Sequence, residues 1–155
     1  MSSSTKCTIE RALRLATHFH EGQIDKQGEP YIFHLITVME LCKQWYKTSC
    51  SEKLLIAAIL HDIVEDSNCT FEFLMDQGVS SEDIGIINSL TKHPDEEYMD
   101  YLKRLSKNSN AVRIKKMDIL HNMSRIAGIP DLDERERLSK KYEFASAYLE
   151  TIDLN

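Results

Sequence analysis

KLLIAAILHDIVEDS, residues 53–67, joins a mostly apolar run to a histidine and three carboxylates. The apolar part has no polar face, which is typical of a helix at the centre of a helical core. Ser51 can cap such a helix, which we expect over residues 52–65. Because a helix C-terminus carries partial negative charge, three acids there are unfavourable unless a cation binds them. The stretch therefore predicts a central helix with a cation site at its end.

Helical spacing of apolar residues recurs along the rest of the chain. Prolines at first helical positions, glycines after last ones and capping serines mark the boundaries. Further helices are expected over residues 6–21, 31–47, 70–78, 81–92, from Pro94 onward, 110–127 and 133–152. The polar segment GQIDKQGEP, 22–30, is expected to be a loop, and Trp45 to pack in the core. No stretch alternates with a period of two, so the prediction is an all-α, single-domain bundle of about seven to eight helices.

Length and charge narrow the classes of partner. A chain of 155 residues is expected to form one domain over residues 1–155. The net charge of −6 argues against binding long nucleic acids, which requires a clustered basic surface. It is compatible with a small anionic ligand held by a cation and a few local basic side chains.

Targeting signals and cysteine usage indicate the compartment. No apolar run approaches the ~18 residues of a membrane span, and MSSSTKCTIERALRL has no signal-peptide core. The four cysteines form no C-x-x-C pair. We therefore expect a protein of the reducing cytoplasm that does not bind membranes.

The acids after the apolar run have a defined geometry if the helix continues. Residues four apart share a face, so His61 lies over Glu65, and Asp62 over Asp66. A lone histidine here would more often be a packed core residue, and acids at a helix end are often solvated. A His-Asp pair after a long apolar run favours a metal site instead. His34, flanked by apolar residues in PYIFHLITV, would also need a buried partner.

A polar stripe on the helix 110–127 supplies the remaining candidates. Asp118, His121, Asn122 and Arg125 are spaced i, i+3, i+4 and i+7, so they share one face, which we interpret as lining a pocket. His121 either packs in the core or holds a metal ligand through a hydrogen bond. A two-histidine, two-carboxylate site suits Mn²⁺, Fe²⁺ or Zn²⁺. Such a site would comprise His34, His61, Asp62 and Asp118.

These motifs together resemble the HD superfamily of metal-dependent phosphohydrolases, whose signature is a histidine, a His-Asp pair and a distant aspartate. HEGQ…GEPYIFH, AAILHDIVEDS, SLTK and KKMDILHNMSRI are similar to the hydrolase domain of the SpoT/RelA alarmone enzymes and their small stand-alone relatives. The resemblance runs from about residue 10 to about residue 145. It implies an HD-type bundle that binds one Mn²⁺ and removes pyrophosphate from the 3′ position of guanosine tetraphosphate (ppGpp).

The resemblance also assigns roles to single residues. It implies His34, His61, Asp62 and Asp118 as metal ligands, and Glu65 and Asp66 as the catalytic acids that position or activate the attacking water. Candidate substrate-binding residues are Lys92 of SLTK and Asn122, to which we add Lys26 and Arg125. Lys141 and Tyr142 of the last helix could close the pocket, although charged positions there usually belong to a solvated face.

One departure bears on the substrate. Asp25 stands where alarmone hydrolases carry an arginine that stacks on the base, which predicts weaker selection of guanine. Two alternatives therefore stay open: hydrolysis of phosphate or pyrophosphate from another nucleotide, and a nucleotide-sensing module with little catalysis. Sensing modules usually lose a ligand or an acid, whereas this chain keeps all of them. We expect a small nucleotide as partner and a monomer or homodimer.

Overall fold

The computed structural model describes residues 5–154, in which helices are joined by loops and the β pairing is limited to one isolated bridge between Ile24 and Pro30. The all-α prediction is confirmed. The helices are α1 (Ile9–Phe19), α2 (Ile32–Tyr46), η1 (Lys47–Ser49), α3 (Glu52–Leu60), α4 (Ile63–Asp66), α5 (Phe71–Asp76), α6 (Ser81–Leu90), α7 (Tyr98–Leu105), α8 (Ser109–Ser124), η2 (Ile126–Gly128) and α9 (Leu132–Glu150).

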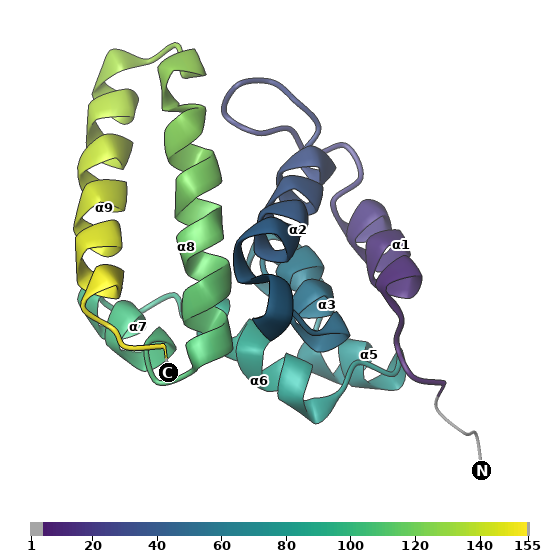
Figure 1. Ribbon diagram of the computed structural model, residues 1–155. Coiled ribbons are helices and arrows are strands. Elements are labelled where there is room, and N and C mark those ends of the chain that lie inside the picture. Colours follow the sequence, from purple (N-terminus) through teal and green to yellow (C-terminus); the bar gives the residue numbers. More distant parts are fainter. Residues whose placement is uncertain (1–4, 155) are drawn as a thin grey trace.

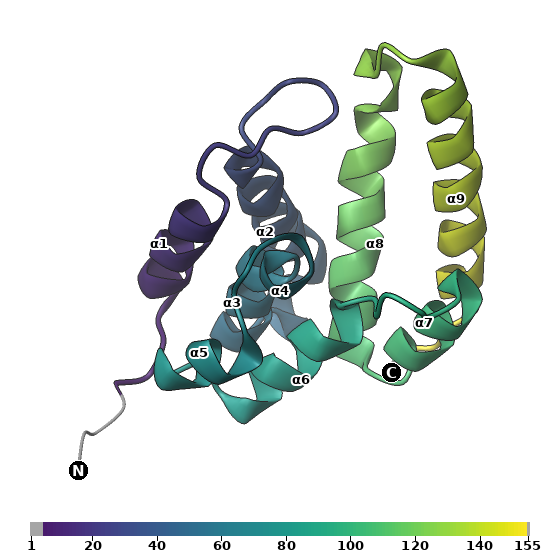
Figure 2. The same ribbon diagram turned by 180° about the vertical axis from the view of Figure 1, so that it is seen from behind.

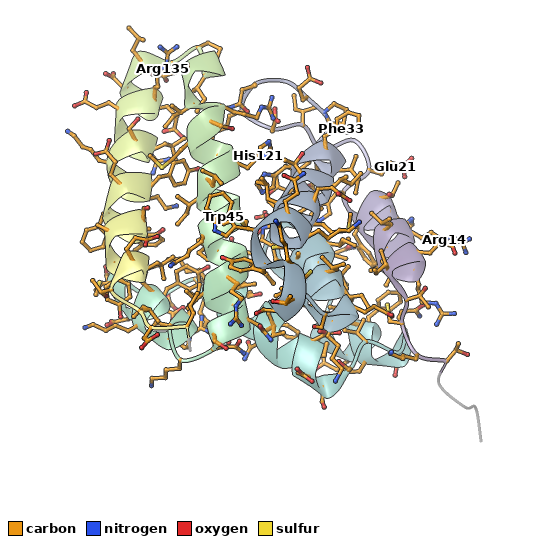
Figure 3. The ribbon with its side chains drawn as sticks, in the orientation of Figure 1. Arg14, Glu21, Phe33, Trp45, His121 and Arg135 are labelled. Carbon is orange, nitrogen blue, oxygen red and sulfur yellow. The ribbon has the colours of Figure 1, made fainter. Side chains whose placement is uncertain are left out.

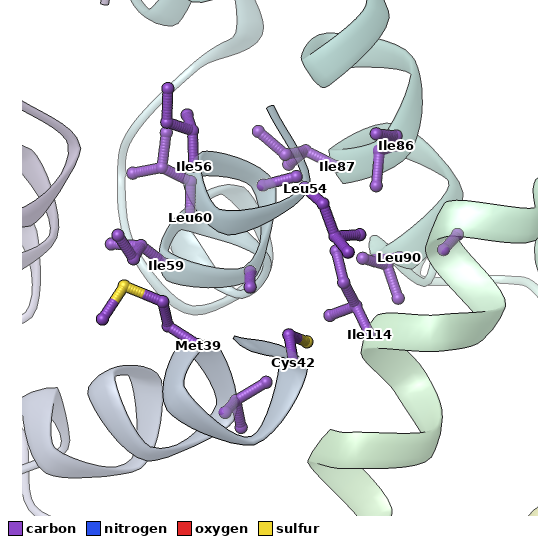
Figure 4. Packing of buried hydrophobic residues seen from close by; sticks show 14 of the residues in the cluster. Met39, Cys42, Leu54, Ile56, Ile59, Leu60, Ile86, Ile87, Leu90 and Ile114 are labelled. Carbon is purple, nitrogen blue, oxygen red and sulfur yellow. The ribbon is translucent and has the colours of Figure 1, made fainter. Parts of the chain in front are cut away.

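Helix α3 occupies the centre, as its apolar sequence predicts. The Ser51 side chain caps it by accepting a hydrogen bond from the Leu54 amide, and every residue from Leu54 to Leu60 is buried. Helices α1, α2 and α6 pack around it (Figures 1 and 2). Figure 4 shows this core, to which α2 contributes Met39 and Cys42, α6 contributes Ile86, Ile87 and Leu90, and α8 contributes Ile114.

The helix predicted over 52–65 is interrupted at His61 and Asp62. The His61 ring places Nδ1 2.6 Å from the Ala58 carbonyl, which an unbroken helix would offer to the Asp62 amide. Asp62 has φ −104° and ψ 0°, outside the helical range, and α4 begins at the next residue. Because of this break, residues 5–154 contain nine α-helices, one more than the upper predicted number.

Two expectations about position are wrong. The helix predicted from Pro94 begins at Tyr98, because Glu96 does not stay at a helix N-terminus but binds the Arg104 guanidinium at 2.8 Å. Trp45 is 65% exposed on the outer face of α2 instead of packing in the core (Figure 3). The other helix ends lie within a few residues of those predicted.

Helices α8 and α9 lie side by side and antiparallel, joined through η2 (Figure 1). The Asn108 side chain caps α8 and the Asp131 side chain caps α9. The loop 22–30 arches from α1 to α2 beside the C-terminal end of α8, where the Gln27 side chain donates to the Arg125 carbonyl at 2.9 Å. Within residues 5–154, no helix has both the length and the apolar character needed to cross a bilayer.

Candidate metal and substrate site

Two histidines and two aspartates from three parts of the fold face one another. His34 comes from α2, His61 and Asp62 from the break between α3 and α4, and Asp118 from α8. The distance from His34 Nε2 to Asp118 Oδ1 is 3.0 Å, and that from His61 Nε2 to Asp62 Oδ2 is 3.1 Å. The distance from His61 Nε2 to Asp118 Oδ1 is 3.8 Å, and that from His34 Nε2 to Asp62 Oδ2 is 3.9 Å. The four side chains thus converge on one point.

The Nδ1 atoms of His34 and His61 each have a partner within the protein. His61 Nδ1 lies 2.6 Å from the Ala58 carbonyl oxygen and therefore donates its proton there. His34 Nδ1 lies 2.7 Å from His121 Nδ1, so His121 fixes that ring from behind; Figure 3 shows its position on α8 facing α2. His61 Nε2 is buried without a hydrogen-bond partner among residues 5–154. A buried nitrogen lone pair aimed at two carboxylates fits a divalent cation.

Neighbouring donors hold the two carboxylates in place. The Tyr31 hydroxyl donates to Asp62 Oδ2 at 2.5 Å. Lys115 Nζ donates to Asp118 Oδ2 at 2.8 Å, and the Asn122 amide donates to Asp118 Oδ1 at 3.0 Å. Such partners orient metal ligands and keep them ionised.

Charges inside the group attract a proton to the position where a cation would lie. Burial opposes the protonated form of His61, but the carboxylates of Asp62 and Asp118 outweigh burial and raise its pKa. Burial likewise opposes ionisation of Asp118, but Lys115 and the two histidines outweigh it and lower the Asp118 pKa. A metal ion at this point would displace that proton, because metal binding requires a neutral imidazole.

Two further carboxylates stand at the edge of the group. One oxygen each from Asp62, Glu65 and Asp66 lies within 4.8 Å of the others. The backbone amide of Lys92 donates to Glu65 Oε1 at 2.6 Å and fixes that side chain. Desolvation, then the charges of Asp62 and Glu65, raise the pKa of Asp66 to about 7. Desolvation also raises the pKa of Glu65.

A cavity of about 480 Å³ opens beside Asp66. Its volume is that of a small-ligand pocket, for which roughly 300–1,000 Å³ is typical. The loop 22–30 forms one wall, and the facing side chains of α8 and α9 form another. The lining residues are Gln23, Ile24, Asp25, Lys26, Gln27, Tyr31, Asp66, Asn122, Ile129, Leu138 and Tyr142.

A family model described as the HD domain matches residues 12–143 of this chain. The chain belongs to the HD domain family. The matched range includes all four residues of the candidate metal group. The resemblance inferred from the sequence motifs is therefore confirmed at the level of the family.

Curated relatives of this HD domain are considerably longer proteins. The probable guanosine-3′,5′-bis(diphosphate) 3′-pyrophosphohydrolase of Synechocystis sp. is 28% identical over 155 residues, which cover 93% of this chain and 20% of that protein. A Borreliella burgdorferi protein named guanosine-3′,5′-bis(diphosphate) 3′-pyrophosphohydrolase is 30% identical over 147 residues, which cover 86% of this chain and 21% of that protein. The chain thus spans about a fifth of the length of these relatives.

A solved structure shares the fold of this HD domain. It is the structure of a metazoan ortholog of SpoT that hydrolyses ppGpp, with a TM-score of 0.81 and 22% identity. The likeness covers 99% of this chain and 92% of that one. At this identity the match establishes the arrangement of helices.

Of the four candidate substrate residues, Lys26 and Asn122 line the cavity, whereas Lys92 and Arg125 do not, and all four are engaged within the protein. Lys26 Nζ lies 2.6 Å from the Glu134 carboxylate, and Lys92 Nζ donates to the His93 carbonyl at 3.3 Å. The Arg125 guanidinium binds Asp25. Asn122 lines the cavity while it donates to Asp118.

Sequence reasoning missed two groups that the fold brings to the site. Tyr31 and Lys115 each stand three residues before a candidate ligand, His34 and Asp118, and that spacing was available as a signal. Tyr142, for which pocket closure and a solvated face were both open, lines the cavity from α9. Its inward position depends on how α9 packs on α8, which periodicity alone does not fix.

Proposed function

We propose that this HD domain is a metal-dependent phosphohydrolase that removes pyrophosphate from the 3′ position of a nucleotide. Guanosine 3′,5′-bis(diphosphate) is the first substrate to test. The observation that carries the proposal is the buried Nε2 of His61, which has no hydrogen-bond partner in the described chain and faces Asp62 and Asp118 beside a nucleotide-sized cavity. The names of the relatives from Synechocystis sp. and Borreliella burgdorferi support the same reaction.

We propose one Mn²⁺ as the resident ion, held by His34, His61, Asp62 and Asp118, with Fe²⁺ or Zn²⁺ as alternatives. Mixed imidazole and carboxylate donors suit these ions better than Ca²⁺. Bound there, such an ion lowers the pKa of a coordinated water and stabilises charge on a phosphoryl oxygen.

The reducing cytoplasm is the proposed location; all four cysteines are free thiols.

In this proposal Glu65 and Asp66 carry the proton transfer. The attacking water forms a bond to the phosphorus next to the ribose 3′ oxygen, and the bond from that phosphorus to the 3′ oxygen breaks. One carboxylate orients the water, and the other takes its proton and passes it to the 3′ oxygen, which leaves as a hydroxyl while pyrophosphate is released. Because the Lys92 amide fixes Glu65, this side chain suits the orienting role. Asp66, which lines the cavity, suits the role of proton acceptor.

The identity of the base is a separate question. Asp25 occupies the loop position of the base-stacking arginine in alarmone hydrolases, and its carboxylate is turned to the loop amides and Arg125. This favours, as a second candidate, a phosphohydrolase that accepts other purine or pyrimidine nucleotides. The metal group and both acids are common to the two candidates.

A hydrolysis panel tests the proposal. The purified protein, loaded with Mn²⁺, is offered guanosine, adenosine and pyrimidine nucleotides that carry 3′ or 5′ mono- or diphosphates. Release of phosphate and of pyrophosphate is followed separately. We expect pyrophosphate from guanosine 3′-diphosphates; release of phosphate or pyrophosphate from adenosine or pyrimidine nucleotides in preference would instead support the second candidate. A panel without turnover, with the metal bound, would leave the nucleotide-sensing module as the remaining interpretation.

A further inference from the structure

Lys141 lies on α9 and is exposed, and its ammonium forms no ion pair with a carboxylate among the described residues. It follows Leu138 by three residues and precedes Tyr142 by one, and both of these line the cavity. Its Nζ lies 4.9 Å from the centre of the Tyr98 ring, a cation–π contact that holds the ammonium group beside α7. Lys141 is thus a cation held in place by a ring rather than by an acid.

The Tyr98 hydroxyl provides a second unused group at the same place. Its oxygen is buried and has no hydrogen-bond partner within residues 5–154. Burial raises the Tyr98 pKa, and the charges of Lys115, Asp118 and Glu65 also act on it. The Tyr98 ring lies 5.8 Å from the Tyr101 ring, and the Lys115 ammonium that pairs with Asp118 lies 5.7 Å from that same Tyr101 ring. These contacts link Tyr98 to the candidate metal group. A buried hydroxyl without a partner is unfavourable, so it requires a ligand or a bound water.

The candidate site needs more positive charge than the metal supplies. Asp62, Glu65 and Asp118 contribute three negative charges, and Asp66 contributes a fourth when it is ionised. A divalent cation and the Lys115 ammonium offset three of them. An anionic ligand would then approach a centre with no excess of positive charge, and this is unfavourable in a partly desolvated cavity. Additional cations that are not already neutralised are required.

Most cations around the cavity are neutralised by nearby acids. Arg125 is paired with Asp25, while Lys26 and Arg137 share Glu134. Among the described residues near the site, Lys92, Arg135 and Lys141 have no carboxylate partner, and Arg135 is engaged by the Ile129 carbonyl. Lys92 was a candidate from its motif, and Lys141 was considered only as a residue that could close the pocket.

We propose that Lys141 and Tyr98 form an anion subsite for the outer phosphate of a diphosphate group whose inner phosphate lies at the metal group. This inference rests on the proposed function for the position of the inner phosphate. Lys141 supplies a mobile ammonium with three donors, and Tyr98 supplies one hydroxyl donor at a fixed position. A monophosphate at the metal group does not extend to them, so the subsite distinguishes a diphosphate from a monophosphate.

Binding of inorganic pyrophosphate and orthophosphate to the Mn²⁺-loaded protein tests this subsite. Calorimetry at a fixed free Mn²⁺ concentration gives both affinities without turnover. We expect Lys141→Gln to weaken pyrophosphate binding about tenfold, because one charge-assisted hydrogen bond is lost, with orthophosphate binding nearly unchanged. Tyr98→Phe keeps the ring beneath Lys141 and removes the hydroxyl only, so a smaller loss, confined to pyrophosphate, is expected.

Lys140→Gln is the matched control. Lys140 is the preceding residue of α9, exposed and paired with Glu136 at 2.8 Å, so the variant removes the same charge from the outer face. Lys141→Arg should restore pyrophosphate binding, which a purely structural role for Lys141 would not predict. Circular dichroism melting of each variant shows whether it is folded.

The outcomes separate the subsite from the proposed reaction. If Lys141→Gln and Lys140→Gln bind pyrophosphate equally, or if Lys141→Gln weakens both anions equally, the subsite is wrong even where nucleotides are hydrolysed. If wild type binds pyrophosphate selectively and Lys141→Gln does not, while the hydrolysis panel is negative, the subsite stands and the reaction fails. Absence of pyrophosphate binding to wild type overturns the subsite directly.

Discussion

Asp25 and Arg125 form an ion pair that fastens the loop 22–30 to the C-terminal end of α8. The same carboxylate accepts hydrogen bonds from the amides of Gln27 and Glu29, each at 2.9 Å. Burial opposes ionisation of Asp25, but the Glu29 amide and the Arg125 guanidinium outweigh it and lower the Asp25 pKa. Asp25 is therefore the anchor of one wall of the cavity.

Removing this anchor should destabilise the loop. We expect Asp25→Ala to lower the unfolding free energy by about 1–3 kcal/mol, since two amides and a guanidinium lose their acceptor. Arg125→Ala should have a smaller effect, because the loop amides keep theirs. Chemical denaturation of both single variants and the double variant gives the coupling energy.

The double variant Asp25→Arg/Arg125→Asp, which exchanges the two charges, is the control. It restores opposite charges but leaves the two loop amides without an acceptor, so we expect it to remain destabilised. Full recovery would show that the ion pair alone holds the loop. Asp25→Arg by itself, the substitution that the sequence suggests for restoring guanine selection, should disturb the cavity wall before it changes the base preference.

Tyr31 should tune the metal affinity without being a ligand. Tyr31→Phe removes the hydroxyl that donates to Asp62 at 2.5 Å, and loss of such a partner typically weakens metal binding about 10–100-fold. Tyr46→Phe is the control, because that hydroxyl donates to the Arg113 carbonyl. Titration with Mn²⁺ gives both affinities. Replacing His34, His61, Asp62 or Asp118 by alanine should abolish binding, and chelation should lower the melting temperature.

Glu65→Gln and Asp66→Asn should separate chemistry from metal binding. Both substitutions keep the shape and remove the base, so we expect full metal content, an unchanged melting temperature and a kcat lower by about 10²–10⁴. KM should change little, since the lost interaction is made in the transition state. A variant that loses its metal would identify its residue as a ligand. Full activity in both would mean that neither acid takes the proton.

Gly78 should be far less tolerant than Gly22 of an added methyl group. Both glycines have positive φ, +85° and +77°, so alanine costs about 1–2 kcal/mol in backbone strain at either site. At Gly78 a Cβ would also lie 2.0 Å from the Thr5 carbonyl oxygen, whereas at Gly22 nothing lies within 4 Å. We expect Gly78→Ala to lose at least about 1–3 kcal/mol more than Gly22→Ala in denaturation. Equal losses would mean that the segment at Thr5 moves freely.

Asp83 should make stability fall as the pH rises from about 4 to about 6. It is 2% exposed, and burial raises its pKa to about 6, whereas the unfolded value is about 3.9. The folded chain thus holds the proton more tightly in this window, and ionisation at higher pH is unfavourable. Asp83→Asn keeps an acceptor for Ser80 and should be more stable than wild type at pH ~7, by about 1–3 kcal/mol.

The difference between Asp83→Asn and wild type should shrink toward pH ~4, where wild type is protonated too. Glu82→Gln, at the exposed neighbour that pairs with Lys53, controls for the loss of one negative charge. A constant difference across this range would show that the carboxyl of Asp83 titrates normally. Equilibrium denaturation at several pH values provides the measurement.

Local signals predicted most of the helices correctly. Ser51 caps the helix assigned to it, and Thr70 and Ser80 cap the helices expected over 70–78 and 81–92, because a hydroxyl three residues before an amide is sufficient to form the bond. The stripe on α8 also lies where its periodicity indicated, with Asp118 and His121 both directed at His34. The roles of these residues in metal binding and catalysis remain predictions.

Features that depend on distant partners could not be read from local pattern. The break at His61 accompanies the placement of its ring beside Asp118 of α8, in which its Nδ1 takes the Ala58 carbonyl. The late start of α7 arises because Arg104 binds Glu96 and also donates to the Thr91 carbonyl. Lys141 meets Tyr98 of α7 because α9 packs on α8. In each case a tertiary contact outweighs a local preference.

Trp45 is the single tryptophan of the chain, and its exposure on α2 determines what intrinsic fluorescence can report about this protein. An indole already in water emits at nearly the wavelength of an unfolded chain, so its intrinsic fluorescence changes little when the core melts. Unfolding is better followed by far-ultraviolet circular dichroism, which an all-helical chain gives strongly. The same indole lies beside Tyr46, Leu120 and Met123 on the surface of α2 and α8. A shift of its emission to shorter wavelength would therefore signal that this face has become covered, while the fold stays intact.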